Sequence, residues 1–166
     1  DSFPTTASGK IQKFKLREQA VEMLGLDAER EIKYLTKKNI ELDAHGKDWQ
    51  RIHTFMEMEV LPIGIDREVL NRASLALQEF YQRVTDSRLA KSNIEVMMII
   101  DKNSLDVGIR YEGEMLEFPL ERPKENQSSL LSGYFIRQLT DRLREEWRAG
   151  SARIHFYFIR RQHRES

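Results

Sequence analysis

The pattern of apolar and polar positions predicts β-strands in four stretches of the chain. Residues 52–60 alternate between the two kinds of position, which is typical of a strand with one buried face. Residues 94–101 and 105–111 are two further predicted strands, of which the second alternates cleanly, and the turn residues 102–104 between them indicate a β-hairpin. Residues 154–158, with Ile, Phe and Phe at every second position, predict a last strand near the end of the chain.

Apolar residues three or four positions apart predict two helices. The first follows Asp66, which can cap a helix N-terminus. Its expected buried face consists of Val69, Ala73, Ala76, Phe80 and Val84. The second helix is expected to stop at Gly150. Its apolar stripe consists of Ile136, Leu139, Leu143 and Trp147.

The predicted order is strand, helix, hairpin, polar loop, helix, strand. One apolar helix face and one apolar sheet face bury each other when they pack as two layers. We therefore predict an α+β fold over residues 51–166, a two-layer sandwich with helices packed on one face of a mostly antiparallel sheet. Residues 1–30 and a charged helical connector over residues 31–50 are expected to precede it.

Composition narrows the classes of function. The chain has 166 residues with 27 Lys plus Arg, 27 Asp plus Glu and no Cys, which excludes disulfides, thiolate metal sites and a cysteine nucleophile. A net charge of zero argues against a nucleic-acid or anionic-membrane partner. The longest apolar run, residues 96–100, is far shorter than the roughly 20 residues of a membrane helix. We expect a cytoplasmic protein without a metal site, since the four His residues lack metal-ligand spacing.

The net charge of zero is the sum of segments whose own net charges differ. Residues 136–166 carry eight Arg and four acidic residues, or +4, whereas residues 1–30 carry five residues of each sign. The remaining residues 31–135 therefore carry −4. A basic part beside an acidic part favours charge pairing within the chain or between subunits over a polyanionic partner.

A loop near the N-terminus, from Pro4 to Lys10, ends in Ser-Gly-Lys and continues into Ile-Gln-Lys-Phe-Lys-Leu-Arg. A glycine beside a lysine lets the backbone approach a ligand closely, and a flexible ammonium can reach a carboxylate and a phosphate. This segment, with Leu-Gly-Leu at residues 24–26, resembles the C-terminal end of acyl-CoA synthetases in the adenylate-forming ligase superfamily. The resemblance covers about residues 1–28. It implies that Lys10 helps a fatty-acid carboxylate attack the α-phosphate of ATP.

That reaction would belong to a longer parent protein, of which we expect this chain to be a C-terminal piece. The resemblance implies ATP, Mg²⁺ and CoA as the parent's cofactors, and the ligase domains as partners in cis. The large ATP- and acyl-binding domain of the family has no counterpart in these 166 residues. We therefore expect no cofactor in the piece itself and no catalysis by Lys10 outside the parent.

Three segments of the second half carry another resemblance. They are residues 75–83, with Glu79 and Arg83; residues 110–114, with Tyr111 and Gly113; and residues 131–139, with Gly133. In this order they resemble the motifs of the Bergerat-type ATP-binding fold of histidine kinases and anti-sigma-factor kinases. The resemblance implies nucleotide binding by these five residues, with Glu79 as the general base.

The chain departs from that pattern at the positions that carry the family's chemistry. Arg83 stands where the family has the Asn that coordinates Mg²⁺; a guanidinium has no lone pair for a metal, although it can contact phosphate. Tyr111 stands where an Asp reads adenine, and its ring would fill the adenine site. Glu114 stands where a glycine gives the lid room. We therefore expect a degenerate nucleotide site, while the residues by themselves also fit other two-layer α/β sandwiches.

The hypothesis that follows is a regulatory or protein-interaction module of an acyl-CoA synthetase-like protein. It would not be catalytic by itself, and its partner would be another protein or a second copy of the chain. The alternative is a domain that senses a nucleotide or a CoA-type ligand in an altered pocket, with Arg83 on phosphate. A third hypothesis, an enzyme in its own right, needs chemistry that the altered positions do not offer.

Overall fold

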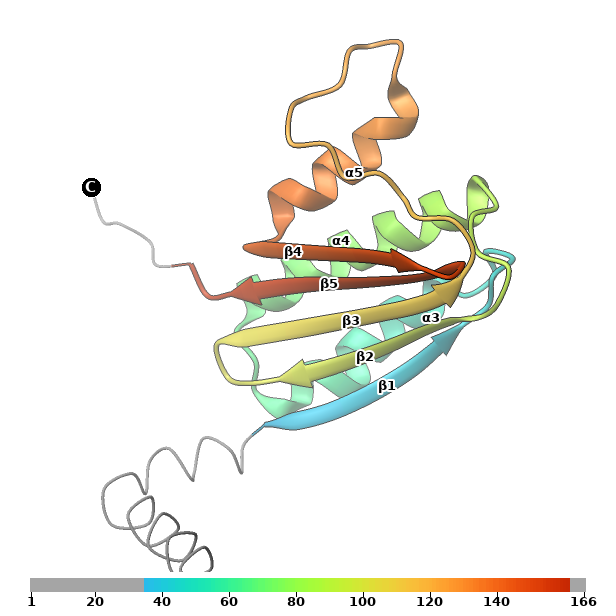
Figure 1. Cartoon of the computed structure of the whole chain (residues 1–166). Helices are drawn as coiled ribbons and strands as arrows, with labels where there is room; N and C mark the ends of the chain where they lie inside the picture. The colour runs from blue at the N-terminus through green and yellow to red at the C-terminus, as the bar shows by residue number, and fades with distance from the viewer. Residues whose placement is uncertain (1–34, 162–166) are drawn as a thin grey trace, which may run out of the picture. The chain divides into compact units, whose positions relative to one another are not determined.

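The computed structural model describes residues 35–161, which form two layers (Figure 1). One layer is a five-stranded sheet in the order β1-β2-β3-β5-β4, and all neighbouring strands are antiparallel. The strands are β1 (Thr36–Leu42), β2 (Ile94–Ile100), β3 (Ser104–Glu112), β4 (Arg142–Arg148) and β5 (Ser151–Ile159). Packed on one face are α3 (Trp49–Phe55), α4 (Arg67–Asp86) and α5 (Ser128–Leu139). The predicted α+β sandwich is confirmed.

Helix α4 forms as predicted and supplies the helical side of the core. Asp66 caps its N-terminus, because the carboxylate accepts hydrogen bonds from the backbone N–H groups of Glu68 and Val69. The predicted apolar face of α4 is completely buried. Its Phe80 ring meets the Phe156 ring of β5 edge to face at 5.7 Å. No helix among residues 35–161 is both long and apolar enough to cross a bilayer.

Strand β1 lies inside the region that was expected to be a helical connector, residues 31–50. It pairs with β2 along its whole length, and Leu42 at its end is fully buried. The helical prediction is wrong here because Lys and Glu on the exposed positions of an edge strand resemble a charged helix until the partner strand is known. The compact unit accordingly begins at Thr36, upstream of the predicted boundary at residue 51.

Residues 52–60 were expected to form a strand but are helical. Helix α3 continues into a π-helical segment, Met56–Val60, and a short 3₁₀ turn, Leu61–Ile63. Ile52, Met56 and Val60 are buried, and a spacing of four places them on one helix face. The same spacing is also a multiple of two, so the apolar pattern fitted both a strand and a helix. Contact with α4 decides in favour of the helix.

The helix predicted over residues 136–147 is wrong in its second half. Helix α5 ends at Leu139, and Leu143 and Trp147 lie on β4, which pairs with β5. In the connection between these strands, Ala149 has a φ of 54° and Gly150 a φ of 79°. Two positive φ values define a type I′ hairpin turn. Gly150 therefore closes a hairpin and does not end a helix.

Candidate functional site

The five residues predicted to bind nucleotide come from three parts of the fold. Glu79 and Arg83 lie on α4, Tyr111 lies on β3 with Gly113 directly after that strand, and Gly133 lies on α5. Lys10, the predicted catalytic lysine of a parent ligase, lies outside the described residues.

Glu79 and Arg83 bind the same side chain of the protein. The buried Ser132 hydroxyl of α5 donates a hydrogen bond to Glu79 Oε2 at 2.8 Å. The Ser132 hydroxyl oxygen in turn accepts a hydrogen bond from Arg83 Nε at 3.0 Å. Because Glu79 and Arg83 are one helical turn apart, a single hydroxyl can join both. These two hydrogen bonds hold α4 against α5. They engage Arg83 Nε and Glu79 Oε2, so these atoms already have a partner within the protein.

Tyr111 is part of the core. Its side chain is only 1% exposed, and its ring centroid lies 6.1 Å from that of Phe80. The Tyr111 hydroxyl donates a hydrogen bond to the carbonyl oxygen of Glu114 at 2.6 Å. Burial raises the pKa of Tyr111 well above its ordinary value, so the group stays a neutral donor. Tyr111 thus ties the segment after β3 to the end of its own strand.

Gly113 and Gly133 allow close contact between parts of the backbone. Gly113 has a φ of +144°, and a Cβ there would lie 1.9 Å from the carbonyl oxygen of Leu89. A Cβ at Gly133 would lie 1.7 Å from the carbonyl oxygen of Glu117. Both distances are too short for any side chain. At these positions the glycines admit the chain's own backbone, in the way that nucleotide-binding glycines admit a phosphate.

The segment after β3 is packed into the core through Phe118. This ring is 5% exposed and lies parallel to Phe80, with 6.4 Å between centroids and 4° between planes. The carbonyl oxygen of Phe118 accepts a hydrogen bond from Arg137 Nε of α5 at 2.8 Å. The segment is therefore held in place by the packing of the Phe118 ring on Phe80 and by the hydrogen bond from Arg137 to its backbone.

Some of these contacts could not be inferred from the motif positions. Ser132 is one residue before Gly133 and lies within a segment that resembles the family, but nothing in the sequence marks its hydroxyl as the partner of Glu79 and Arg83. Phe118 stands with Met115, Leu116 and Leu120 in a largely apolar stretch after β3. Several apolar side chains in a connecting segment are the one signal that could have indicated an anchor to the core.

The fold is Bergerat-like: three helices packed on a five-stranded antiparallel sheet. The solved structure of the RsbU and RsbW domains of Rv1364c from Mycobacterium tuberculosis is similar to this chain, with a TM-score of 0.56 over 76% of it and 15% identity. The match covers 33% of that other chain. No protein-family model and no curated protein matches. At this identity the likeness establishes the fold.

The resemblance of residues 1–28 to acyl-CoA synthetases has no support from these comparisons. The segment also lies outside the described residues. It stays a prediction from the sequence.

Proposed function

We propose that residues 36–161 form a Bergerat-like protein-interaction or regulatory module that does not use Mg-ATP. The observation that carries this proposal is the packing around Tyr111. This side chain and Phe118 are both buried beside Phe80, where the sequence resemblance would place the adenine-binding residue. Opening a pocket there would expose aromatic side chains that fill the core, and each such side chain contributes about 1.5–3 kcal/mol by its burial.

The contacts of Arg83 and Glu79 also support a module that does not use Mg-ATP. Arg83 cannot coordinate a metal, and it donates to Ser132. Glu79 accepts a hydrogen bond from the same hydroxyl. Phosphoryl transfer relies on a metal and positioned charges. Because Arg83 stands in place of the metal ligand and both charged side chains are engaged by Ser132, the module is proposed to act by contact with another protein surface.

Calorimetric titration of Mg-ATP and Mg-ADP into the 166-residue chain tests this function. We expect no saturable heat up to millimolar nucleotide. A micromolar Kd would overturn the proposal. Arg83→Ala serves as the control: a weak heat that is unchanged in this variant does not come from the site.

A second candidate function is phosphate-ligand binding by the terminal N–H groups of the Arg83 guanidinium. Among the described residues only its Nε has a hydrogen-bond partner, and the side chain is half-buried. Its terminal N–H groups could contact the phosphate of a metal-free nucleotide or of CoA. Binding of AMP, ADP or CoA without metal that is lost in Arg83→Ala would favour this candidate. A panel without any binding would remove it.

We further infer an acyl-CoA synthetase-like parent, supported by the Gly9-Lys10 motif and the residues around it. In that parent, Lys10 would act with ATP, Mg²⁺ and CoA on a fatty acid. The test is acyl-CoA formation by the longer protein and by its Lys10→Ala variant. Loss of activity in the variant supports the attachment, and a coding sequence without an upstream adenylate-forming domain overturns it.

A further inference from the structure

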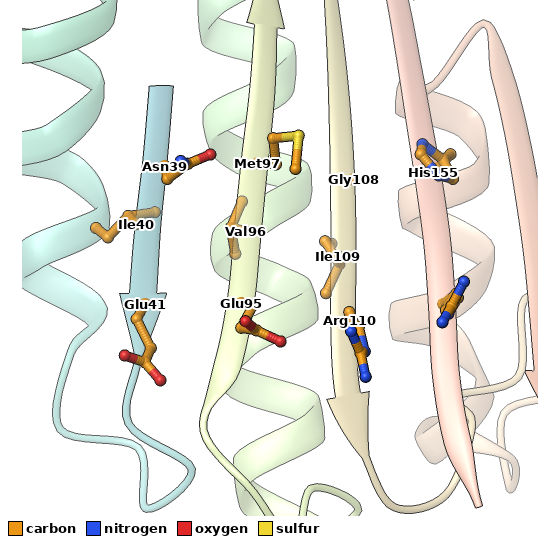
Figure 2. Close-up of a pocket in the computed structure, with 11 residues that line it drawn as sticks. Asn39, Ile40, Glu41, Glu95, Val96, Met97, Gly108, Ile109, Arg110 and His155 are labelled. Carbon is orange, nitrogen blue, oxygen red and sulfur yellow. The ribbon is translucent and has the colours of Figure 1, made fainter. Parts of the chain in front are cut away.

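The outer face of the sheet is hollowed at its centre. Helices α3, α4 and α5 cover the other face (Figure 1). A hollow of about 520 Å³ lies across β1, β2, β3 and β5. At its floor is Gly108, with Met97 on one neighbouring strand and His155 on the other (Figure 2). A Cβ on Gly108 would lie 3.1 Å from His155 Cε1, so the missing side chain keeps the hollow open.

Two apolar side chains stand beside this hollow. On β2, Met97 is 42% exposed and Ile99 is 39% exposed. The solvated face of an antiparallel sheet is normally polar. A long, adaptable thioether beside a hollow of side-chain size is a combination typical of a contact surface.

A row of four charges crosses the same face. The strand register places Glu41 opposite Glu95, Glu95 opposite Arg110, and Arg110 opposite Arg153. From β1 to β5 the row therefore reads acid, acid, base, base. Like charges directly opposite each other destabilise a sheet, and this row contains two such pairs. Within residues 35–161, none of the four takes part in an ion pair.

This order of charges is complementary to itself. A two-fold rotation about an axis parallel to the strands, between β2 and β3, lays a second copy on the face with its row reversed. Glu95 then faces Arg110 of the second copy, and Glu41 faces Arg153 of the second copy. Sheets stack face to face at about 10 Å, a distance that these long side chains can span from both sides.

The same rotation places the Met97 side chain of each copy over the hollow of the other copy. Met97 and Gly108 are direct neighbours in the register, on the two sides of the axis. Each Met97 therefore lies over Gly108 of the other copy. We propose that the chain forms a two-fold homodimer through the outer face of its sheet, with both Met97 side chains seated in the opposite hollows and the two charge rows paired.

The size of the face sets the expected strength of the dimer. Four strands at about 4.8 Å spacing and about seven residues at about 3.3 Å each give roughly 440 Å² per copy. The total of about 900 Å² is below the roughly 1,200 Å² of stable specific interfaces and is typical of weak, transient ones. We therefore expect weak, reversible association that appears only at high micromolar protein concentrations. Equal numbers of acids and bases in the row make a polyanion a poorer occupant of this face than a second copy.

Sedimentation velocity on the full chain at low salt, from a few micromolar to several hundred micromolar, tests the dimer. The mass is expected to rise from 19.7 kDa towards twice that value. Raising the NaCl concentration to about 0.5 M should weaken association, since the paired charges are screened. A chain that stays monomeric over the whole range overturns the proposal.

Charge reversal tests the surface itself. Glu95→Arg places like charges opposite Arg110 of the second copy, and Arg110→Glu does the same opposite Glu95; we expect each to weaken the dimer at least tenfold. Mixed in equal amounts, the two variants should form a heterodimer. The arginines at positions 95 and 110 of one variant then face the glutamates at positions 110 and 95 of the other. Glu125→Arg is the matched control, since Glu125 is exposed in the loop before α5 and lies outside the sheet, and it should leave the Kd unchanged.

Circular dichroism of the variants establishes that they are folded. A dimer that survives both single reversals, or single variants that do not associate when mixed, would place the interface elsewhere or exclude it. Dimerisation through this face does not depend on the nucleotide position, so calorimetry and sedimentation can fail independently.

Discussion

Arg72 is a buried charge that joins distant parts of the domain. The residue is 8% exposed and lies on α4. Its guanidinium donates to the carboxylates of Glu68 and Asp141, and to the carbonyl oxygens of Leu139 at 3.0 Å and Ile159 at 2.5 Å. It thereby connects α4 to the ends of α5 and β5. Arg72→Met would keep most of the stem and remove every one of these hydrogen bonds.

The cost follows from the exposure of the partners. Removing one member of a fully buried ion pair costs about 3–5 kcal/mol. Here the side chains of Asp141 and Glu68 are 22% and 35% exposed, so water can solvate them again. Asp141 also keeps hydrogen bonds from the Ile159 N–H and from Arg161. We therefore expect Arg72→Met to lower the free energy of unfolding by about 2 kcal/mol.

Urea unfolding at pH 7, followed by circular dichroism, measures this loss. Arg67→Met is the matched control on the same helix, because Arg67 pairs with Glu57 at 2.9 Å but has a 57% exposed side chain. Its loss should stay below about 0.5 kcal/mol. Equal losses in the two variants, or no loss in Arg72→Met, would refute the argument from burial.

The same network predicts an acid-dependent loss of stability. The hydrogen bond from Arg72 lowers the pKa of Glu68 below its ordinary 4.5. For Asp141, burial acts to raise the pKa, but hydrogen bonds from Ile159, Arg72 and Arg161 outweigh it and lower the pKa below 3.8. The unfolded chain thus binds protons at a higher pH than the folded chain. The stabilisation is complete above about pH 5, begins to decrease as the pH falls through 4.5 and 3.8, and is lost as the pH falls through the lower pKa values of the folded state. In Arg72→Met this loss should be smaller.

Three further substitutions test individual parts of the fold by urea unfolding. Ala149→Asn should stabilise by about 1 kcal/mol, because Ala149 has a φ of 54° and Asn-Gly suits a type I′ turn; no gain would contradict this turn. Gly133→Ala should destabilise by about 3 kcal/mol or more, because its Cβ would lie 1.7 Å from a backbone oxygen of Glu117; a folded variant of unchanged stability would contradict this contact. Trp147→Phe should cost about 1 kcal/mol through the lost 2.8 Å hydrogen bond from Nε1 to the carbonyl oxygen of Gly113; a loss near zero would show that water replaces the bond.

The candidate site was only partly predictable. The spacing of Glu79 and Arg83 places both on one helix face from sequence alone. Their joint partner, Ser132, is 53 residues from Glu79 and 49 residues from Arg83. A serine hydroxyl can serve many structural purposes, so no local pattern identifies that contact. Tyr111 was expected to fill a pocket, and its place in the core depends on Phe80 and Phe118, which come from other elements.

The sequence by itself determined the elements whose signals are local and redundant. Helix α4 has a cap, a length of 20 residues and an apolar stripe that agree, and the hairpin of β2 and β3 has turn residues between an apolar stretch and an alternating stretch. The tertiary structure alone decided the secondary structure of residues 36–42, 52–60 and 142–148, because the apolar pattern of such short stretches fits both a strand and a helix. Pairing with β2 and β5 and packing on α4 resolved that ambiguity. The charge row of the outer face arises in the same way, since only strand register places Glu41, Glu95, Arg110 and Arg153 side by side.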